Sequence, residues 1–182
     1  MSDDMLIRHC APTLAGLKTG NLFSCFFDDK AALIQDIRKI NKTLRPKGIC
    51  LLPLLFSDGR ALLYLYRPDS LRKDLADEEV FQILKRFGYK GNTLGQCLRN
   101  LIDRLKNNAD FPHEIGLFLS YPPEDVKGFI DDKDHFKFSG LWKVYGDEKK
   151  ARTLFDQYKK CTEYYCGAYR SGVSLEHLAV AI

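Results

Sequence analysis

The sequence lacks any long apolar run. Its longest one, residues 49–56, is interrupted by Pro53, whereas a membrane-spanning helix needs about 20 consecutive apolar residues. The chain opens with Met-Ser-Asp-Asp, so the basic start and apolar stretch of a secretory signal peptide are missing there as well. We therefore expect a cytoplasmic protein that makes no contact with a membrane.

Charge of one sign is not in excess either. The chain holds 28 Lys and Arg residues against 24 Asp and Glu residues, a formal net charge of +4, and the two signs are interleaved along it. Proteins that bind nucleic acid are usually more basic and gather their charge on one face. We expect no nucleic acid partner, which leaves a small molecule or another protein as the partner.

Several motifs with known chemistry are also absent. No Cys-x-x-Cys occurs, so neither a zinc ribbon nor a thioredoxin-type redox pair is indicated. His113-Glu114 has no second histidine at the zincin spacing, and Lys18-Thr19-Gly20-Asn21 lacks the remainder of a phosphate-binding loop. Without an oxidising compartment, the six cysteines do not support a disulfide framework. The pattern therefore fixes no cofactor and no set of metal ligands.

What the chain does contain is enough apolar material for a core. It has 182 residues, of which 45% are hydrophobic and 12% aromatic, and no Pro-, Gly- or Ser-rich linker divides it. A chain of this size buries roughly 70% of its unfolded surface on folding. We predict a single domain over residues 1–182 with an α/β (or α+β) fold.

The predicted architecture is a mixed sheet of about five strands, covered by helices. Its clearest element is a hairpin over residues 49–66, because Asp58-Gly59 between two apolar runs is a typical two-residue turn. We expect the other strands at residues 22–27 and 115–121, and a long strand or a bent ribbon at residues 136–145. Apolar periodicity predicts a helix that opens at Asp28 and Asp29 and stops near Pro46 and Gly48, and further helices at residues 77–88, 93–106, 124–130 and 147–169. At the N-terminus, a helix begins after Ser2, and Pro12 is expected to bend the chain at Ala11 before a second helix that Gly20 ends.

Two segments of the sequence are similar to each other. Residues 62–71 and 117–126 each read as an apolar strand, then Tyr-x-Pro-acid, then a helix start. Proline and an acidic residue both suit the first turn of a helix, so two ordinary strand-to-helix turns explain the pattern. The alternative is that both turns lie at one edge of the sheet, where Tyr66 and Tyr121 would line a pocket.

Cys10 is the candidate nucleophile of the sequence. A histidine next to a cysteine can lower the pKa of the thiol, so His9 would serve as the base. Adjacent residues on a helix point about 100° apart, however, and a buried free cysteine is common. The competing interpretation is therefore a core Cys10 beside a surface His9.

Five further residues are candidate ligand contacts: Lys18, Asn21, His113, Glu114 and Tyr121. His113 and Glu114 stand at the entry to a hydrophobic segment, where ionisable groups need partners if they are buried. We expect one pocket between the turn at residues 11–21 and the segment at residues 112–124. Glu114 serves either as part of this site or as a structural anchor.

Three blocks of the sequence resemble a known family. They are residues 9–18 with Asn21-Leu22-Phe23, residues 111–119 with Tyr121-Pro122-Pro123-Glu124-Asp125-Val126, and Trp142-Lys143-Val144-Tyr145-Gly146. The family is known as domain of unknown function 3793 and consists of small proteins, mostly of anaerobic bacteria. The resemblance spans nearly the whole chain and implies a self-contained cytoplasmic domain, but it assigns no activity, cofactor or residue role. Ser120 stands where the family pattern leads us to expect glycine.

Three functions follow as hypotheses. The first is a small-ligand- or metal-binding domain that is non-catalytic or weakly catalytic. The second is a cysteine-dependent thiol or redox enzyme that uses Cys10. The third is an adaptor that binds a protein partner through the aromatic and basic helix around Lys159 and Lys160, in the manner of an accessory protein of flavodoxin or iron metabolism.

Overall fold

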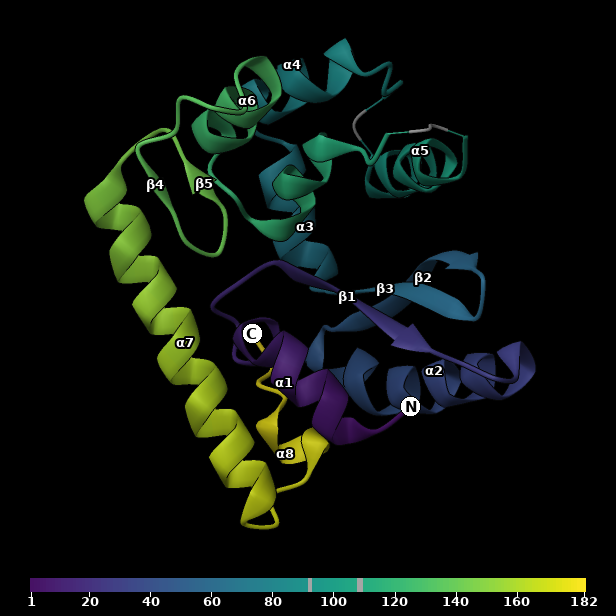
Figure 1. The fold of residues 1–182 in the computed structure, drawn as a ribbon. Helices are drawn as coiled ribbons and strands as arrows, with labels where there is room; N and C mark the ends of the chain where they lie inside the picture. Colours follow the sequence, from purple (N-terminus) through teal and green to yellow (C-terminus); the bar gives the residue numbers. More distant parts are fainter. Residues whose placement is uncertain (92, 108–109) are drawn as a thin grey trace. The chain divides into compact units, whose positions relative to one another are not determined.

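The computed structural model describes residues 1–91, 93–107 and 110–182. These residues form two compact units. Unit 1 comprises Met1–Asp69 together with Tyr158–Ile182, so it contains both ends of the chain, and unit 2 comprises Ser70–Gln157 (Figure 1). The single domain predicted for residues 1–182 stays a prediction, because compact units of one chain fold either together or separately.

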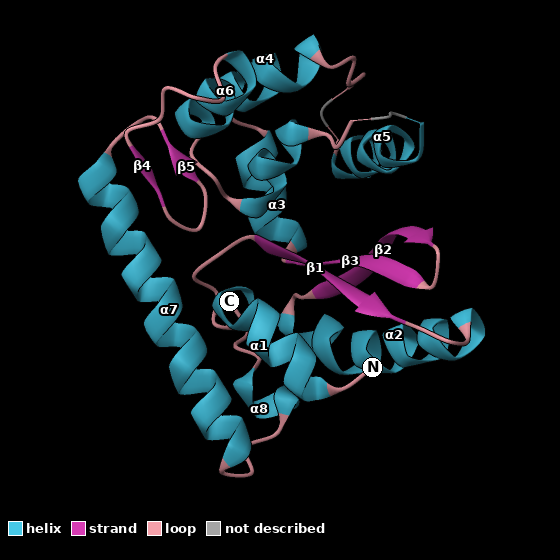
Figure 2. Cartoon of the chain, viewed as in Figure 1, coloured by secondary structure: helices cyan, strands magenta, loops and turns pink. Residues whose placement is uncertain are grey.

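Unit 1 is a small antiparallel sheet with helices packed on it. Its strands are β1 (Gly20–Phe26), β2 (Cys50–Ser57) and β3 (Arg60–Tyr66), in the order β1-β3-β2. Figure 2 shows helices α1 (Asp3–Leu14) and α2 (Lys30–Leu44) on the same face of this sheet. The remaining elements are the short helix η1 (Arg45–Lys47), the C-terminal part of α7 (Glu148–Arg170) and α8 (Leu175–Leu178).

The predicted hairpin of unit 1 is confirmed. Ser57 pairs with Arg60, so the loop consists of Asp58 and Gly59 alone. Both loop residues have positive φ angles, 45° and 72°, which is the conformation that a tight turn between twisted strands requires. The predicted strand at residues 22–27 is likewise confirmed as β1, which pairs with β3 along its whole length.

Helix α2 shows how the sequence specifies an element of this unit. The side chain of Asp29 caps the helix by accepting a hydrogen bond from the backbone N–H of Ala31 at 2.8 Å. Apolar side chains recur at Leu33, Ile37, Ile40 and Leu44, and all four are buried. Burying such a side chain contributes roughly 1.5–3 kcal/mol, so this face holds the helix on the sheet.

Helix α1 does not bend at Ala11. It continues through Pro12 to Leu14, and Gly16 with a φ of 80° follows it. The expected second helix ending at Gly20 is therefore wrong, since Gly20 is the first residue of β1. Burial overrides the local preference, because Ala11 and Leu14 are completely buried in the core and the helix needs only two more residues after the proline.

Arg67 is buried inside unit 1 and links separate segments of it. Its side chain is 2% exposed and donates hydrogen bonds to the carbonyls of Thr13 and Leu14, both at 2.8 Å, and of Val180 at 2.7 Å. The first two carbonyls belong to the C-terminal end of α1, where a positive charge is favourable. Val180 in turn donates its N–H to Leu14 at 3.0 Å. One buried cation thus joins the first helix to the C-terminal segment.

Unit 2 is mainly helical. Its elements are α3 (Pro68–Leu75), α4 (Glu78–Arg86), α5 (Leu94–Asn107), the 3-10 helix η2 (His113–Leu119), α6 (Pro123–Asp131), β4 (Phe138–Ser139), β5 (Lys143–Val144) and the first turns of α7. The predicted helices at residues 77–88, 93–106, 124–130 and 147–169 are confirmed within two residues. Among the described residues, no helix is both long and apolar enough to cross a membrane.

One strand prediction fails in unit 2, and the long strand or bent ribbon expected at residues 136–145 takes the form of a hairpin. The segment at residues 115–121 is the 3-10 helix η2 followed by a turn, and the segment at residues 136–145 is the short hairpin β4–β5. The strands of the described residues therefore form a three-stranded and a two-stranded sheet, not a mixed sheet of five. A short run that is apolar on all sides suits a buried strand and a buried helix equally well, so periodicity could not separate them.

Asp125 fastens the hairpin to α6. Its buried carboxylate accepts hydrogen bonds from Trp142 Nε1 at 2.7 Å and from the backbone N–H groups of Tyr145 and Gly146 at 2.7 and 2.8 Å. The Trp142 ring stacks on Tyr121, with ring centroids 4.4 Å apart. These contacts bring together the second and third sequence blocks, which lie about twenty residues apart along the chain.

Candidate functional site

The predicted site residues divide between the two units. His9, Cys10, Lys18 and Asn21 belong to unit 1, whereas His113, Glu114 and Tyr121 belong to unit 2. The expectation that residues of both units share one pocket therefore stays a prediction, and each group is described within its own unit.

Cys10 is a core residue of unit 1. Its side chain is 0% exposed, and burial raises the pKa of its thiol above the ordinary value, while the charge of Lys18 opposes this only in part. The neighbouring His9 is exposed, and its ring stacks on Phe23 with centroids 5.6 Å apart. This arrangement keeps the thiol protonated, which is the opposite of what a nucleophile needs.

Lys18 and Asn21 lie in the connection from α1 to β1. The Asn21 side-chain oxygen accepts a hydrogen bond from the Thr13 hydroxyl at 2.7 Å. The Lys18 ammonium group is buried over the ring of Tyr158, 5.7 Å from its centroid, and burial lowers the pKa of Lys18 to about 8. Both side chains therefore make packing or hydrogen-bond contacts within unit 1 near the C-terminal end of α1.

The strongest candidate site lies in unit 2 and centres on Glu114. Its side chain is 0% exposed. One carboxylate oxygen, Oε1, forms an ion pair with Arg104 Nε and accepts a hydrogen bond from the Tyr89 hydroxyl at 3.2 Å. The other oxygen, Oε2, is buried and has no hydrogen-bond partner among the residues that the structure describes. Such an oxygen is costly, because a buried carboxylate must regain the hydrogen bonds that water gave it.

The neighbours of Glu114 respond to its charge. Burial raises the pKa of Tyr89 above its ordinary value, and the charge of Glu114 and the hydrogen bond to it add to the effect. Arg104 also donates from Nη1 to the carbonyl of Phe87 at 3.2 Å, and its guanidinium carbon lies 5.0 Å from the centre of the Phe87 ring. The ion pair is thus held at a fixed place by α4, α5 and η2.

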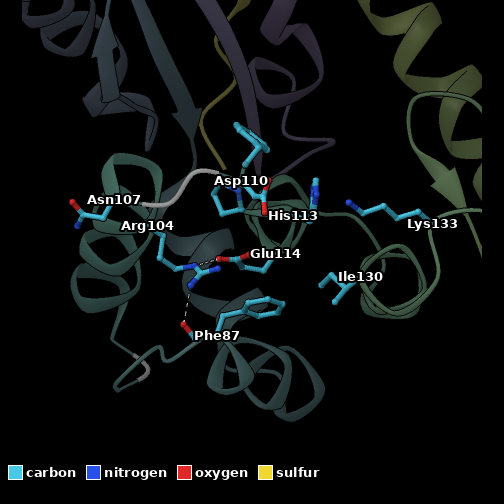
Figure 3. A pocket seen from close by; sticks show the side chains of 10 residues that line it. Phe87, Arg104, Asn107, Asp110, His113, Glu114, Ile130 and Lys133 are labelled. Atoms are coloured by element: carbon cyan, nitrogen blue, oxygen red, sulfur yellow. Dashed lines mark hydrogen bonds and ion pairs between the residues drawn. The ribbon is translucent and has the colours of Figure 1, made fainter.

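Glu114 lines a pocket of about 540 Å³. Figure 3 shows the Glu114 side chain with Arg104, Phe87, Ile130 and His113 around it. The complete lining is Phe87, Arg104, Asn107, Asp110, Phe111, Pro112, His113, Glu114, Ile130 and Lys133. Pockets for small molecules typically measure about 300–1,000 Å³, so this pocket has the size of such a site. Four of its ten lining residues are apolar and six are polar or charged.

His113 shares this pocket, but Tyr121 does not. The His113 ring lies edge-on to Phe129 at 4.9 Å, and burial together with Lys133 lowers the pKa of His113 below its ordinary value. Tyr121 instead lines a second pocket of about 430 Å³, next to Pro122, Lys73 and Lys150. The structure therefore brings two of the predicted residues together and separates the third from them.

A metal centre finds no support in the residues that the structure describes. They contain no group of three or more His, Cys, Asp or Glu residues that could hold a metal ion. All six cysteines are free thiols, as expected from a sequence without support for disulfides.

Sequence reasoning missed both partners of Glu114, which are Arg104 and Tyr89, and the pocket residues Phe87 and Lys133. Arg104, Tyr89, Phe87 and Lys133 come from three other segments, and no spacing links them to His113-Glu114. The one available signal was the acid at the start of an apolar run, which predicts that a partner exists but not which residue it is.

The family model described as "Protein of unknown function (DUF3793)" matches residues 6–179. The chain therefore belongs to this family, as its three sequence blocks suggested, and the match includes every residue of the pocket in unit 2. No curated protein and no solved structure matched the chain.

Proposed function

We propose that this protein binds a small polar organic molecule in the pocket of unit 2. The observation that carries the proposal is Glu114, which is completely buried in the wall of a 540 Å³ pocket and has a carboxylate oxygen without a partner. A ligand that donates a hydrogen bond to this oxygen would remove the cost of leaving it unpaired.

The rest of the lining supports an organic ligand. Phe87, Phe111, Pro112 and Ile130 supply apolar surface beside six polar or charged lining residues. Half of the Phe111 side chain, 49%, is exposed, although an aromatic ring in contact with water gains from being covered. A bound molecule in contact with Phe111 would cover part of it.

The other two hypotheses gain less from the structure. A Cys10 enzyme would need an accessible thiolate, whereas the thiol is buried and its pKa raised. Rapid labelling of Cys10 by iodoacetamide would revive this hypothesis. The adaptor function and the cytoplasmic location stay predictions.

The test is native mass spectrometry on protein purified gently from several hosts. We expect an additional mass that disappears under denaturing conditions. The Glu114→Gln variant should lose this mass, whereas Glu79→Gln, which changes an exposed glutamate of α4, should keep it.

Phe111→Ala provides a second test that does not disturb a buried charge. We expect this variant to fold normally and to retain less of the bound molecule than the wild type does. A bare wild-type mass from every host, or full occupancy in Glu114→Gln, would contradict the proposed function.

A further inference from the structure

The polar groups at the base of the unit 2 pocket form a specific pattern. Glu114 Oε2 is a hydrogen-bond acceptor without a partner. Arg104 uses its Nε for Glu114 and its Nη1 for the Phe87 carbonyl. Since a guanidinium group carries five N–H donors, one wall offers both an acceptor and donors.

The charges of the pocket cancel. The negative Glu114 is paired with the positive Arg104, and the exposed Asp110 and Lys133 contribute one charge of each sign. The remaining titratable residue, His113, has a lowered pKa and is therefore neutral near pH 7. A pocket with no net charge favours a neutral ligand over an anion or a cation.

The apolar walls favour a flat ligand. The Phe87 ring lies against the Arg104 guanidinium group, and the exposed Phe111 ring lines the same pocket with Pro112. Aromatic rings prefer offset stacking or edge contacts with other flat groups. The pattern of one acceptor and neighbouring donors also matches the edge of a planar amide.

We propose that the ligand is a neutral, flat heterocycle with an adjoining N–H and C=O, as in a lactam. The N–H donates to Glu114 Oε2, and the C=O accepts a hydrogen bond from the Arg104 guanidinium group. This inference rests on the proposed function, because it names the class of molecule that the same pocket binds.

The test compares two probes that differ at the ring nitrogen, where N–CH₃ replaces the N–H donor. Isoquinolin-1(2H)-one carries the N–H and the C=O, and its 2-methyl derivative keeps the carbonyl and the ring but has no N–H. NMR titration of the wild-type protein should give at least about tenfold weaker binding of the methylated probe, because Glu114 Oε2 is then left buried without a donor. The Arg104 Nε–H signal, assigned by its loss in Arg104→Lys, should shift less with the methylated probe than with the first probe at the same concentration, because less of the methylated probe is bound.

A variant shows whether Glu114 is the source of the discrimination. In Glu114→Gln the amide oxygen takes the place of Oε1 beside Arg104, and the amide N–H₂ replaces the acceptor Oε2. The preference for the N–H probe should therefore fall to about twofold or less. Glu79→Gln should keep the preference of the wild type.

The outcomes separate this inference from the proposed function. Equal binding of the two probes by the wild type would overturn the inference, as would tighter binding of benzoate or benzamidinium. In either case a bound mass that depends on Glu114 would still support the proposed function. The absence of that mass, together with no binding of either probe, would overturn both.

Discussion

Three buried ionised side chains of this protein are satisfied to different degrees. Asp125 accepts three hydrogen bonds, and Arg67 donates to three carbonyls at less than 3 Å. Glu114 has partners at one oxygen only. A buried side chain whose hydrogen-bonding groups all have partners stabilises the fold, whereas an unpaired oxygen on a residue that lines a pocket indicates a ligand contact. The candidate site therefore follows from the difference between residues that look alike in the sequence.

Lys18 gives the first prediction at this scale. Burial lowers its pKa from 10.5 to about 8, so between these values the unfolded chain binds more protons than the folded protein does. Because of this residue, the free energy of unfolding rises as the pH increases from about 8 to 10.5, and this gain is lost as the pH falls again. Lys18→Met removes this titration. The free energy of unfolding of the wild type should therefore rise relative to that of Lys18→Met by up to about 3 kcal/mol across this interval.

Urea denaturation of both proteins at a series of pH values measures the effect. Comparing the two removes the contributions of tyrosines and cysteines, which titrate in the same interval in both. Lys159→Met, which changes an exposed lysine, serves as the control. Its difference from the wild type in free energy of unfolding should stay the same across this pH interval. A stability difference for Lys18→Met that does not change with pH would contradict the prediction.

Ser120 gives the second prediction. Its φ angle is 59° and its ψ angle 27°, the left-handed conformation that costs a residue other than glycine roughly 1–2 kcal/mol. Glycine, which the family pattern led us to expect here, adopts this conformation easily. We expect Ser120→Gly to be about 1 kcal/mol more stable than Ser120→Ala in thermal unfolding. The two variants lose the same hydroxyl, so equal stability would show that the backbone carries no strain here.

At the scale of elements, helices were predictable and short irregular segments were not. Capping residues and apolar periodicity located α2, α4, α5, α6 and α7 to within a few residues. Residues 115–121 were predicted as a strand but form a 3-10 helix and a turn. In this arrangement η2 passes so close to α6 that a Cβ atom at Gly116 would lie only 2.8 Å from the Val126 side chain. That close approach of η2 to α6 is a tertiary contact, and the apolar pattern contains no trace of it.

The link between α6 and the β4–β5 hairpin yields the third prediction. Asp125→Ala leaves the Trp142 indole N–H and two backbone N–H groups without their acceptor, so we expect a loss of about 3 kcal/mol in the free energy of unfolding. The chain has one tryptophan, and its fluorescence reports the local change directly. In the variant, Trp142 should be more accessible to acrylamide quenching than in the wild type.

Asp156→Ala is the matched control, because this aspartate is exposed on α7. It should leave both the stability and the quenching unchanged. If Asp125→Ala left the Trp142 environment as it is in the wild type, the hairpin would be held by the aromatic stack with Tyr121 alone.

At the scale of the whole molecule, unit 1 is assembled from the two ends of the chain. Arg67 joins α1 to the segment around Val180, and Arg67→Met would leave buried carbonyls without donors. We expect a loss of about 3 kcal/mol and faster amide hydrogen exchange in α1, β1 and α8. In Asp125→Ala the faster exchange should lie in α6 and the hairpin instead.

This pair of variants also tests the predicted single domain. Exchange that increases in one unit only, in each variant, would show two units that open independently. Exchange that increases over the whole chain in both variants would show that the units unfold together, as a single domain does.

The sequence by itself determined the family, the hairpin, the long helices and the acid at residue 114 that needs a partner. These depend on patterns that lie within one segment, such as caps, a two-residue turn and apolar spacing. Only the tertiary structure decided that the partners are Arg104 and Tyr89, that residues 113–119 coil as a 3-10 helix, and that Cys10 is enclosed. The reason is physical: burial and hydrogen bonding depend on which distant segments meet, and a local pattern predicts that a group needs a partner without identifying it.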